Sequence, residues 1–184
     1  MVYIFLADGF EECEALIPID ILRRASVEIK TVGVTGKTVT GSHGISVICD
    51  VLKDDITFDD DIEAVILPGG MPGTLNLKKD SVVTDFVTKA MNKGVLVAAI
   101  CAAPSILGSI GYLKDKKAVC YPGFENELIG AEISSHTVVR DGNIITAKGV
   151  GAAFDFGFEI LNTLKNSPTE IEKLKQTMIY RQED

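Results

Sequence analysis

Cys101 has the surroundings of a reactive thiol. The apolar run Val95–Ile100 leads into it, and small residues with Pro104 separate it from the helical pattern that follows. This arrangement predicts a strand, a sharp turn and a helix, with the cysteine at the turn as in the nucleophile elbow of hydrolases. Because the N-terminus of a helix favours an anion, we expect the pKa of this thiol to be lowered. A small buried cysteine at the end of a strand fits the same pattern, so the local sequence leaves both interpretations open.

Two glycines are candidates for presenting backbone N–H groups to an anion. Gly69 and Gly70 follow the apolar run Ala64–Leu67, and glycine leaves the backbone free to adopt unusual dihedral angles. Together with the N–H of Ala102, their N–H groups could hold the oxyanion of a reaction intermediate. An ordinary tight turn is the alternative interpretation.

Glu14 is the candidate general acid or base. It lies near the start of a predicted helix and directly precedes the apolar face of that helix, so we expect its carboxyl group to be partly buried. A buried carboxyl group beside a thiolate has a raised pKa, and it can donate a hydrogen bond to sulfur or transfer a proton. The preceding acids Glu11 and Glu12 are interpreted as a solvated first turn.

The two histidines and Cys120 are weaker candidates. His43 lies in a glycine-flanked turn and His136 precedes a strand, which is typical of surface or capping histidines. Cys120 ends a short strand before Tyr121, where it fits a core thiol better than a second reactive one.

Apolar strands alternate with amphipathic helices along the chain. The predicted strands are Val2–Ala7, Val27–Val34, Ala64–Leu67, Val95–Ile100 and Lys117–Cys120, with hairpins over Gly36–Asp50 and Val138–Ile145. Helices are predicted after Glu14, Asp80 or Ser81, Cys101, Gly151 and Ser167. Pro18 should kink or divide the first helix, Gly94 should end the second, and Ser167–Glu170 reads as a capping box for the last. The alternation predicts a mostly parallel sheet with helices on both faces.

Sites in such sheets form beyond the carboxyl ends of the strands. The segment Asp8–Glu14, the pair Gly69–Gly70 and Cys101 all follow predicted strands. Because separate loops would then meet at one crevice, this convergence favours the reactive interpretation of Cys101.

Composition narrows the classes of partner. The chain has 184 residues, 46% of them hydrophobic, which fits one α/β domain over residues 1–184. A formal net charge of −8 without a basic cluster argues against nucleic-acid partners, and no apolar stretch approaches the roughly 20 residues of a membrane span. The four cysteines show no C-x-x-C motif and, with two histidines, no metal-ligand spacing. We therefore expect a cytoplasmic protein with reduced thiols, no metal and no membrane partner.

Six short motifs follow one another along nearly the whole chain. They are Ala7–Glu12 with Glu14, Ile17–Asp20 with Arg23–Ala25, Leu67–Gly70, Ala98–Ala102, Asp141–Thr146 and Gly149–Ala153. In residue type, order and spacing they resemble the ThiJ/PfpI superfamily, and in particular the branch of the Parkinson-disease-associated protein deglycase.

This resemblance implies a flavodoxin-like three-layer sandwich, related to class I glutamine amidotransferases and usually a homodimer. It implies that Cys101 is a nucleophile readily oxidised to sulfinic acid, that Glu14 is its protonated partner, and that the backbone of Gly70 and Ala102 forms an anion pocket. The activities it implies are cofactor-free glyoxalase III and deglycase action on methylglyoxal, glyoxal and their adducts, with a stress-response role. A non-catalytic redox sensor or chaperone operated by oxidation of Cys101 is the alternative.

The chain departs from the family pattern at several positions. The deglycase branch carries a histidine near the nucleophile, and Tyr121 occupies the matching position, so Tyr121 and His43 are retained as possible accessory residues. The protease-like branch has a histidine directly after the cysteine, where this chain has Ala102. Amidotransferases need a downstream His-x-Glu motif, which His136–Val138 does not provide. Protease and amidotransferase activities are therefore disfavoured. We also expect the first helix and Cys49 to lie near a dimer contact.

Overall fold

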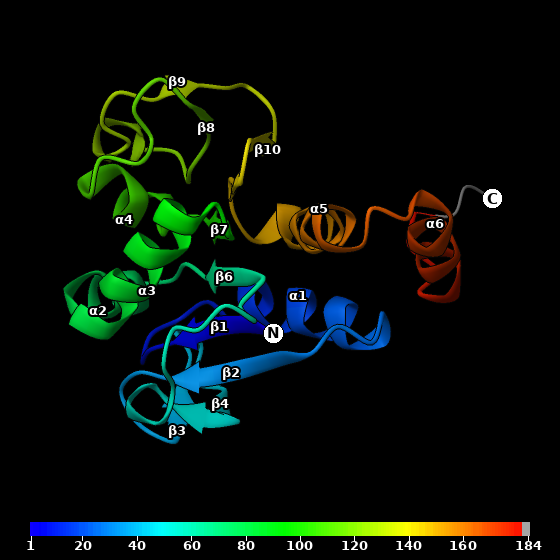
Figure 1. The fold of residues 1–184 in the computed structure, drawn as a ribbon, viewed down its shortest axis with the longest axis horizontal. Helices are drawn as coiled ribbons and strands as arrows, with labels where there is room; N and C mark the ends of the chain where they lie inside the picture. Colours follow the sequence, from blue (N-terminus) through cyan, green and yellow to red (C-terminus); the bar gives the residue numbers. More distant parts are fainter. Residues whose placement is uncertain (182–184) are drawn as a thin grey trace.

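A seven-stranded sheet forms the centre of the molecule, which we describe for residues 1–181 from a computed structural model (Figure 1). The strand order is β10-β11-β7-β6-β1-β2-β5. The bounds are β1 Val2–Leu6, β2 Ile29–Gly33, β5 Val51–Leu52, β6 Ala64–Leu67, β7 Leu96–Ile100, β10 Val138–Asp141 and β11 Ile144–Ala147. All neighbours are parallel except the β10–β11 hairpin. The predicted mostly parallel α/β fold is confirmed.

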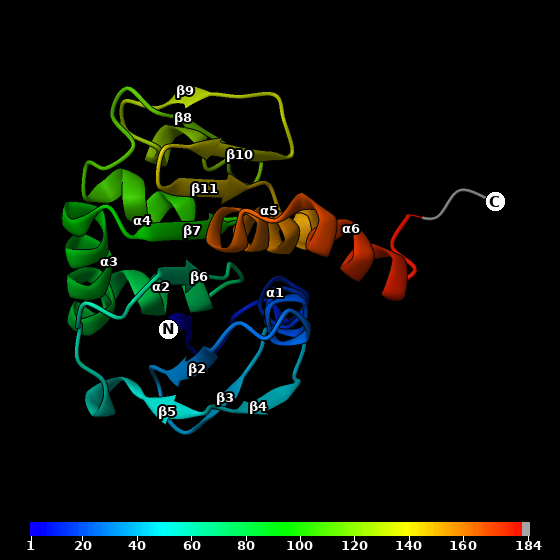
Figure 2. The same cartoon turned by 45° about the vertical axis from the view of Figure 1, so that its right-hand side comes forward.

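Helices cover both faces of this sheet (Figures 1 and 2). The helices are α1 Glu12–Arg24, α2 Gly73–Lys79, α3 Ser81–Lys93, α4 Pro104–Ser109, α5 Ala153–Lys165 and α6 Pro168–Thr177. Alternate β1 residues serve two cores, because Val2, Ile4 and Leu6 pack with α1 and α5, while Tyr3 and Phe5 pack with α2, α3 and α4. This double burial explains why the strands read as continuous apolar runs. No helix within residues 1–181 is long and apolar enough to cross a membrane.

Two small sheets lie outside the central one. β3 (Thr38–Thr40) and β4 (Ser46–Ile48) form the predicted antiparallel hairpin. β8 (Lys117–Ala118) pairs in parallel with β9 (Glu132–Ile133), so the predicted strand Lys117–Cys120 is shorter than expected and does not join the main sheet. Short 3-10 turns occupy Lys53–Asp55, Glu125–Glu127 and Val150–Ala152.

The predicted helix ends are only partly correct. Asp80 caps α3 by accepting the N–H groups of Val82 and Val83, and Gly94 ends it in the left-handed conformation. Ser167, in contrast, makes no side-chain capping bond, so the predicted capping box is absent although α6 does begin with Pro168. Proline at this position already fits the first helical turn without a donated N–H.

Pro18 does not divide the first helix, which runs without interruption as α1. Packing against α5 provides the compensation, because α1 approaches Gly157 of α5 very closely. A Cβ atom on Gly157 would lie 3.2 Å from Pro18 Cα and 2.7 Å from Ile21 Cδ1. Tertiary packing of this kind overrides the weak helix propensity of proline.

Candidate active site

The candidate site lies where four adjacent parallel strands end. Cys101 follows β7, Gly69 and Gly70 follow β6, and the loop leading to Glu14 follows β1. Backbone hydrogen bonds join these ends, since Cys101 N–H donates to Ala147 O of β11 at 2.9 Å and Glu11 N–H donates to Gly69 O at 2.9 Å. The strand-end features identified in the sequence are therefore brought to one edge of the sheet.

Cys101 occupies a sharp turn. Its φ angle of 65° lies in the left-handed region, which is sparsely populated for residues other than glycine. Ala103 N–H donates to Ile100 O at 3.0 Å and closes the turn around it. The buried residues Ala102 and Ala103 then lead into α4. Local backbone strain of this kind clusters at functional sites, and it leaves the half-buried Cys101 at the tip of the turn.

Glu14 is 1% exposed and faces the cysteine. Its Oε2 accepts the N–H of Gly69 at 3.0 Å, and its carboxylate accepts a hydrogen bond from the Cys101 thiol. Burial and the charge of Glu11 raise the pKa of Glu14 to about 7, although the two hydrogen bonds act to lower it. The carboxyl group therefore gains and loses its proton near neutral pH, as required for proton transfer.

Glycine is required at both positions after β6. A Cβ atom on Gly69 would lie 2.5 Å from Cys101 Cβ and 2.6 Å from Glu14 Oε2. Gly70 has a φ angle of 90°, and a Cβ there would lie 2.3 Å from the backbone nitrogen of Glu11. These close approaches hold the acid and the thiol against the backbone.

The two glycines differ in what their N–H groups contact. The Gly69 N–H is bonded to Glu14, so the expectation that it lines the anion pocket is wrong. The N–H groups of Gly70 and Ala102 instead donate to the Cys101 sulfur. Two donors aimed at the reactive atom form an arrangement that favours negative charge on it or on an attached oxygen.

The pKa of the Cys101 thiol is raised, which corrects the expected lowering. Burial and the charge of Glu14 raise it to about 12, and the N–H groups of Gly70 and Ala102 offset this only in part. The helix dipole contributes little, since α4 has six residues and begins three positions after the cysteine. Protonation of Glu14 removes the repulsion, so thiol and carboxyl groups titrate as a coupled pair.

Glu12 is buried rather than solvated, which corrects a second expectation. It is 3% exposed and accepts hydrogen bonds from the backbone N–H of His43 at 2.7 Å and from the His43 ring at 2.9 Å. Burial acts to raise the pKa of Glu12, but these bonds outweigh it and lower the pKa to about 2. His43, 70% exposed, therefore joins the β3–β4 turn to α1 and is not placed on the thiol.

Glu11, Glu12 and His43 together present three atoms that could coordinate a cation. The atoms lie within 4.8 Å of one another. Sequence spacing concealed this group because His43 is 31 residues from Glu12. Both Glu12 oxygens already accept hydrogen bonds from the β3–β4 turn, so we interpret the group as a structural contact between α1 and that turn. We call these hydrogen bonds to Glu12 the Glu12 clasp.

Tyr121 lies at the mouth of the site with a residue that sequence reasoning missed. Its N–H donates to Cys101 O at 2.8 Å, and its side chain is 51% exposed. A Cβ atom on Gly149 would lie 3.4 Å from Tyr121 Cδ2 and 3.7 Å from Glu14 Oε1, so Gly149 also borders the site. Its position just after β11 was the available indication, since that strand ends at the same edge.

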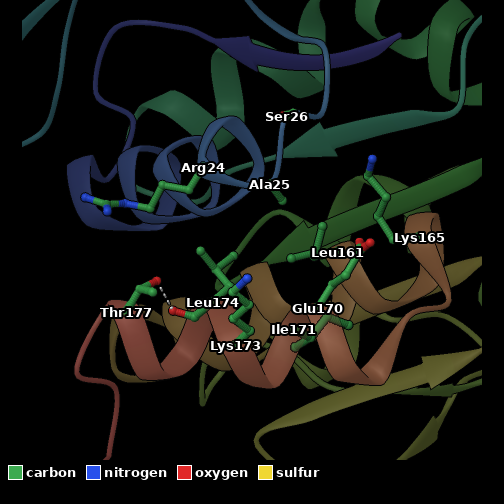
Figure 3. A pocket seen from close by; sticks show the side chains of 10 residues that line it. All are labelled: Arg24, Ala25, Ser26, Leu161, Lys165, Glu170, Ile171, Lys173, Leu174 and Thr177. Carbon is green, nitrogen blue, oxygen red and sulfur yellow. Dashed lines mark hydrogen bonds between the residues drawn. The ribbon is translucent and has the colours of Figure 1, made fainter.

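The groove shown in Figure 3 lies at the other end of α1. It encloses about 270 Å³ where the end of α1 meets α5 and α6, with Ala25, Leu161 and Leu174 in its wall. Glu14 and Arg24 are about 15 Å apart along the helix at 1.5 Å per residue, so this groove is separate from the thiol.

Comparisons with known proteins identify the family of this chain. Residues 1–163 match the DJ-1/PfpI family. The chain is 34% identical over 175 residues to protein dj-1beta of Drosophila melanogaster, covering 92% of this chain and 93% of the relative. It is 32% identical over 162 residues to deglycase PfpI of Pyrococcus furiosus, covering 86% and 96%.

A solved structure shows the same fold. A cysteine-to-alanine mutant of a DJ-1 superfamily protein from Salmonella typhimurium superimposes with a TM-score of 0.91 at 31% identity, covering 98% of each chain. Its flavodoxin-like α/β arrangement is shared along the whole length compared. The chain therefore belongs to the DJ-1/PfpI family.

Proposed function

We propose that this protein is a cysteine-dependent glyoxalase or deglycase that acts on methylglyoxal, glyoxal or their adducts without a cofactor. The observation that carries the proposal is the pairing of the Cys101 thiol with the buried carboxyl group of Glu14, beside the N–H groups of Gly70 and Ala102. Deglycase-named relatives at about 30% identity support the reaction class.

The first step is addition of sulfur to the aldehyde. Glu14 takes the thiol proton, and the Cys101 thiolate forms a C–S bond with the aldehyde carbon while the carbonyl electron pair moves to oxygen. The N–H groups of Gly70 and Ala102 stabilise this oxyanion. Protonation of the oxyanion by Glu14 gives a hemithioacetal and restores the carboxylate.

The second step is a proton transfer between adjacent carbons. The Glu14 carboxylate removes the C–H proton of the hemithioacetal carbon, giving an enediolate, and the protonated Glu14 then returns this proton to the neighbouring carbon. The hydroxyl proton of the first carbon moves to the neighbouring oxygen, which leaves a thioester beside a hydroxyl group. One carbon is oxidised and its neighbour is reduced, so no external oxidant or reductant is needed. Water then cleaves the resulting thioester, which releases lactate from methylglyoxal or glycolate from glyoxal and regenerates the thiol.

The test is hydroxyacid formation by purified wild type and by Cys101→Ser. Wild type should release lactate from methylglyoxal over many turnovers, whereas Cys101→Ser should release none above the uncatalysed rate. Cys13→Ser is the matched control because Cys13 is an exposed thiol on α1. Equal rates for wild type and Cys101→Ser would overturn the proposal.

The alternative is a redox sensor or chaperone operated by oxidation of Cys101. The same N–H donors and a protonated Glu14 would stabilise a sulfinate formed when peroxide oxidises the thiolate. Turnover separates the two functions, since a sensor is consumed once by peroxide and releases no hydroxyacid. We extend either proposal to a role in the stress response.

We also propose a homodimer in the cytoplasm. Leu16 on α1 and Ile45 and Ile48 on the β3–β4 hairpin are exposed apolar residues, with Ile48 74% exposed. The Glu12 clasp brings their two elements together. Sedimentation should show a dimer at micromolar concentration that Ile48→Glu weakens, and a monomeric wild type would contradict this. The four free thiols suit a reducing compartment.

A further inference from the structure

Gly149 is held beside the reactive cysteine by the sheet. It lies two positions after β11, whose last residue, Ala147, accepts the N–H of Cys101 at 2.9 Å. Its own carbonyl oxygen accepts the N–H of Ala152 at 2.8 Å, which fixes the backbone at the start of α5. The residue at position 149 therefore faces the site from a rigid strand end.

Neither backbone conformation nor crowding requires glycine at position 149. Its φ angle of 162° is extended backbone that any residue can adopt. The nearest atoms to a Cβ placed there would be Tyr121 Cδ2 at 3.4 Å and Glu14 Oε1 at 3.7 Å, both ordinary van der Waals distances. What glycine provides is space the size of a methyl group, bounded by the Tyr121 ring and the Glu14 carboxyl group.

The ring of Tyr121 borders this space. Hydrogen bonds from its N–H to Cys101 O and from Phe124 N–H to its own carbonyl hold its backbone. Within residues 1–181 its hydroxyl group has no hydrogen-bond partner, so the ring is the part that contacts the site. An aromatic ring at this position offers an apolar surface to a bound group.

We propose that Gly149 and the Tyr121 ring form the subsite for the substituent on the second carbonyl carbon of the dicarbonyl, the one that Cys101 does not attack, with Gly149 setting its size. This inference rests on the proposed function. Once Cys101 binds the aldehyde carbon, the neighbouring carbon must face Glu14 to receive its proton. Oε2 of Glu14 is held by Gly69, and Oε1 faces Gly149. The substituent, which is hydrogen in glyoxal, methyl in methylglyoxal and phenyl in phenylglyoxal, then points toward the gap, which accommodates a methyl group more easily than a phenyl ring.

The decisive experiment compares kcat/KM for these three dicarbonyls in wild type and Gly149→Ala. The added methyl group should reduce kcat/KM for methylglyoxal by about tenfold or more relative to glyoxal, and for phenylglyoxal further, because a single carbon in an apolar pocket discriminates on this scale. Gly151→Ala is the matched control, since no atom lies within 4 Å of a Cβ there. An equal effect on all three substrates, or none, would overturn the inference.

Two Tyr121 variants distinguish the contribution of the ring to substrate preference from that of the hydroxyl group. Tyr121→Phe should preserve the substrate ratios within about twofold, whereas Tyr121→Ala should raise the relative rate with phenylglyoxal by removing the ring. A change in the ratios caused by Tyr121→Phe would assign the specificity to the hydroxyl group and contradict the role of the ring.

A thiol assay distinguishes failure of the subsite from failure of the proposed function. In a Cys13→Ser background, alkylation of Cys101 by iodoacetamide and by its bulkier N-phenyl analogue is followed by peptide mapping. Gly149→Ala should slow the N-phenyl reagent several-fold more than iodoacetamide, whether or not wild type releases hydroxyacid. If wild type releases hydroxyacid but Gly149→Ala slows both reagents equally, the subsite fails and the proposed function stands. If wild type shows no turnover but the N-phenyl reagent is slowed more, the proposed function fails, and Gly149 is retained only as a size limit on groups that reach Cys101. Equal slowing without turnover contradicts both.

Discussion

Glu12 and Glu14 are separated by one residue on α1 and are both almost completely buried, yet their carboxyl groups behave in opposite ways. The pKa of Glu12 is lowered to about 2, whereas that of Glu14 is raised to about 7. Two positions on a helix are about 200° apart, so the side chains point to different parts of the molecule. Glu12 faces the β3–β4 turn, and Glu14 faces Gly69 and Cys101.

Hydrogen-bond and charge partners, more than burial, decide the charge of these two buried acids. Burial acts to raise both pKa values. Glu12 accepts bonds from the His43 ring and from backbone N–H groups, and these favour its anion. Glu14 has fewer donors and the charge of Glu11 nearby. The first acid is therefore suited to holding structure as an anion, and the second to carrying a proton.

The largest effect should be on turnover, which substitution of Glu14 should reduce strongly and substitution of Glu12 should leave nearly unchanged. Glu14→Gln keeps a hydrogen-bond donor but cannot carry a proton, so kcat for methylglyoxal should fall by about 10²–10⁴-fold, the usual scale of general acid–base catalysis. Glu12→Gln should remain within a few-fold of wild type. Lactate release under saturating substrate measures both. Comparable losses in the two variants would contradict the assignment of proton transfer to Glu14 alone.

Thiol titration is the control for the Glu14 variant. Above neutral pH the wild-type Glu14 carboxylate is charged, and this charge raises the pKa of Cys101. Glu14→Gln removes the charge, so the thiol pKa should be lower than in wild type and alkylation of Cys101 should not be slower. Thiolate absorbance against pH in a Cys13→Ser background would show this. Slower alkylation would mean that the loss of turnover reflects a damaged nucleophile instead of a missing proton carrier.

The next effect is on the pH dependence of stability. The folded protein raises the pKa of Glu14 from 4.5 to about 7, so it binds this proton more tightly than the unfolded chain does. Stability from the neutral carboxyl group is therefore greatest at low pH and declines as pH rises from about 4.5 to 7. Between about pH 5 and pH 8 the free energy of unfolding in urea should fall for both proteins or for wild type alone, and the fall should be larger for wild type than for Glu14→Gln by at most about 3 kcal/mol. Parallel pH profiles would contradict a raised pKa.

Substitution of Glu12 should have a smaller effect, on the free energy of unfolding. Glu12→Ala leaves the N–H groups of His43 and Ile45 without their acceptor, which should cost about 1–3 kcal/mol at neutral pH. Since the pKa of Glu12 is lowered, its contribution is present above about pH 4.5 and is lost as pH falls toward 2. Urea unfolding with Glu28→Ala, an exposed acid, as control tests this. Equal stability of the two variants would make the clasp energetically neutral.

The same contrast shows what sequence could and could not reveal. Cys101, Gly70 and Glu14 were predictable because each follows a buried strand, and parallel strands end at one edge. Glu12 was misread because a run of acids looks solvated until its partner is known, and that partner lies 31 residues away. The raised pKa of Cys101 was missed for a related reason, since it depends on burial and on the charge of Glu14. Local pattern predicts where these residues lie, but long-range contacts set their charges.

Substitution of His43, the hydrogen-bond partner of Glu12, should have a smaller effect than substitution of either acid. Hydrogen bonding to Glu12 raises the pKa of His43, so its protonated form is the one favoured by folding. Its contribution to stability should therefore be complete below about pH 6 and disappear as pH rises through the folded pKa. His43→Gln should be slightly less stable than wild type at about pH 5.5 and indistinguishable from it at about pH 9, as measured by urea unfolding. Because the ring contacts Glu12 and not the thiol, lactate release should be unchanged within about twofold at either pH. A large loss of turnover in His43→Gln would move this histidine into the proton-transfer path and reopen the assignment of that role to Glu14.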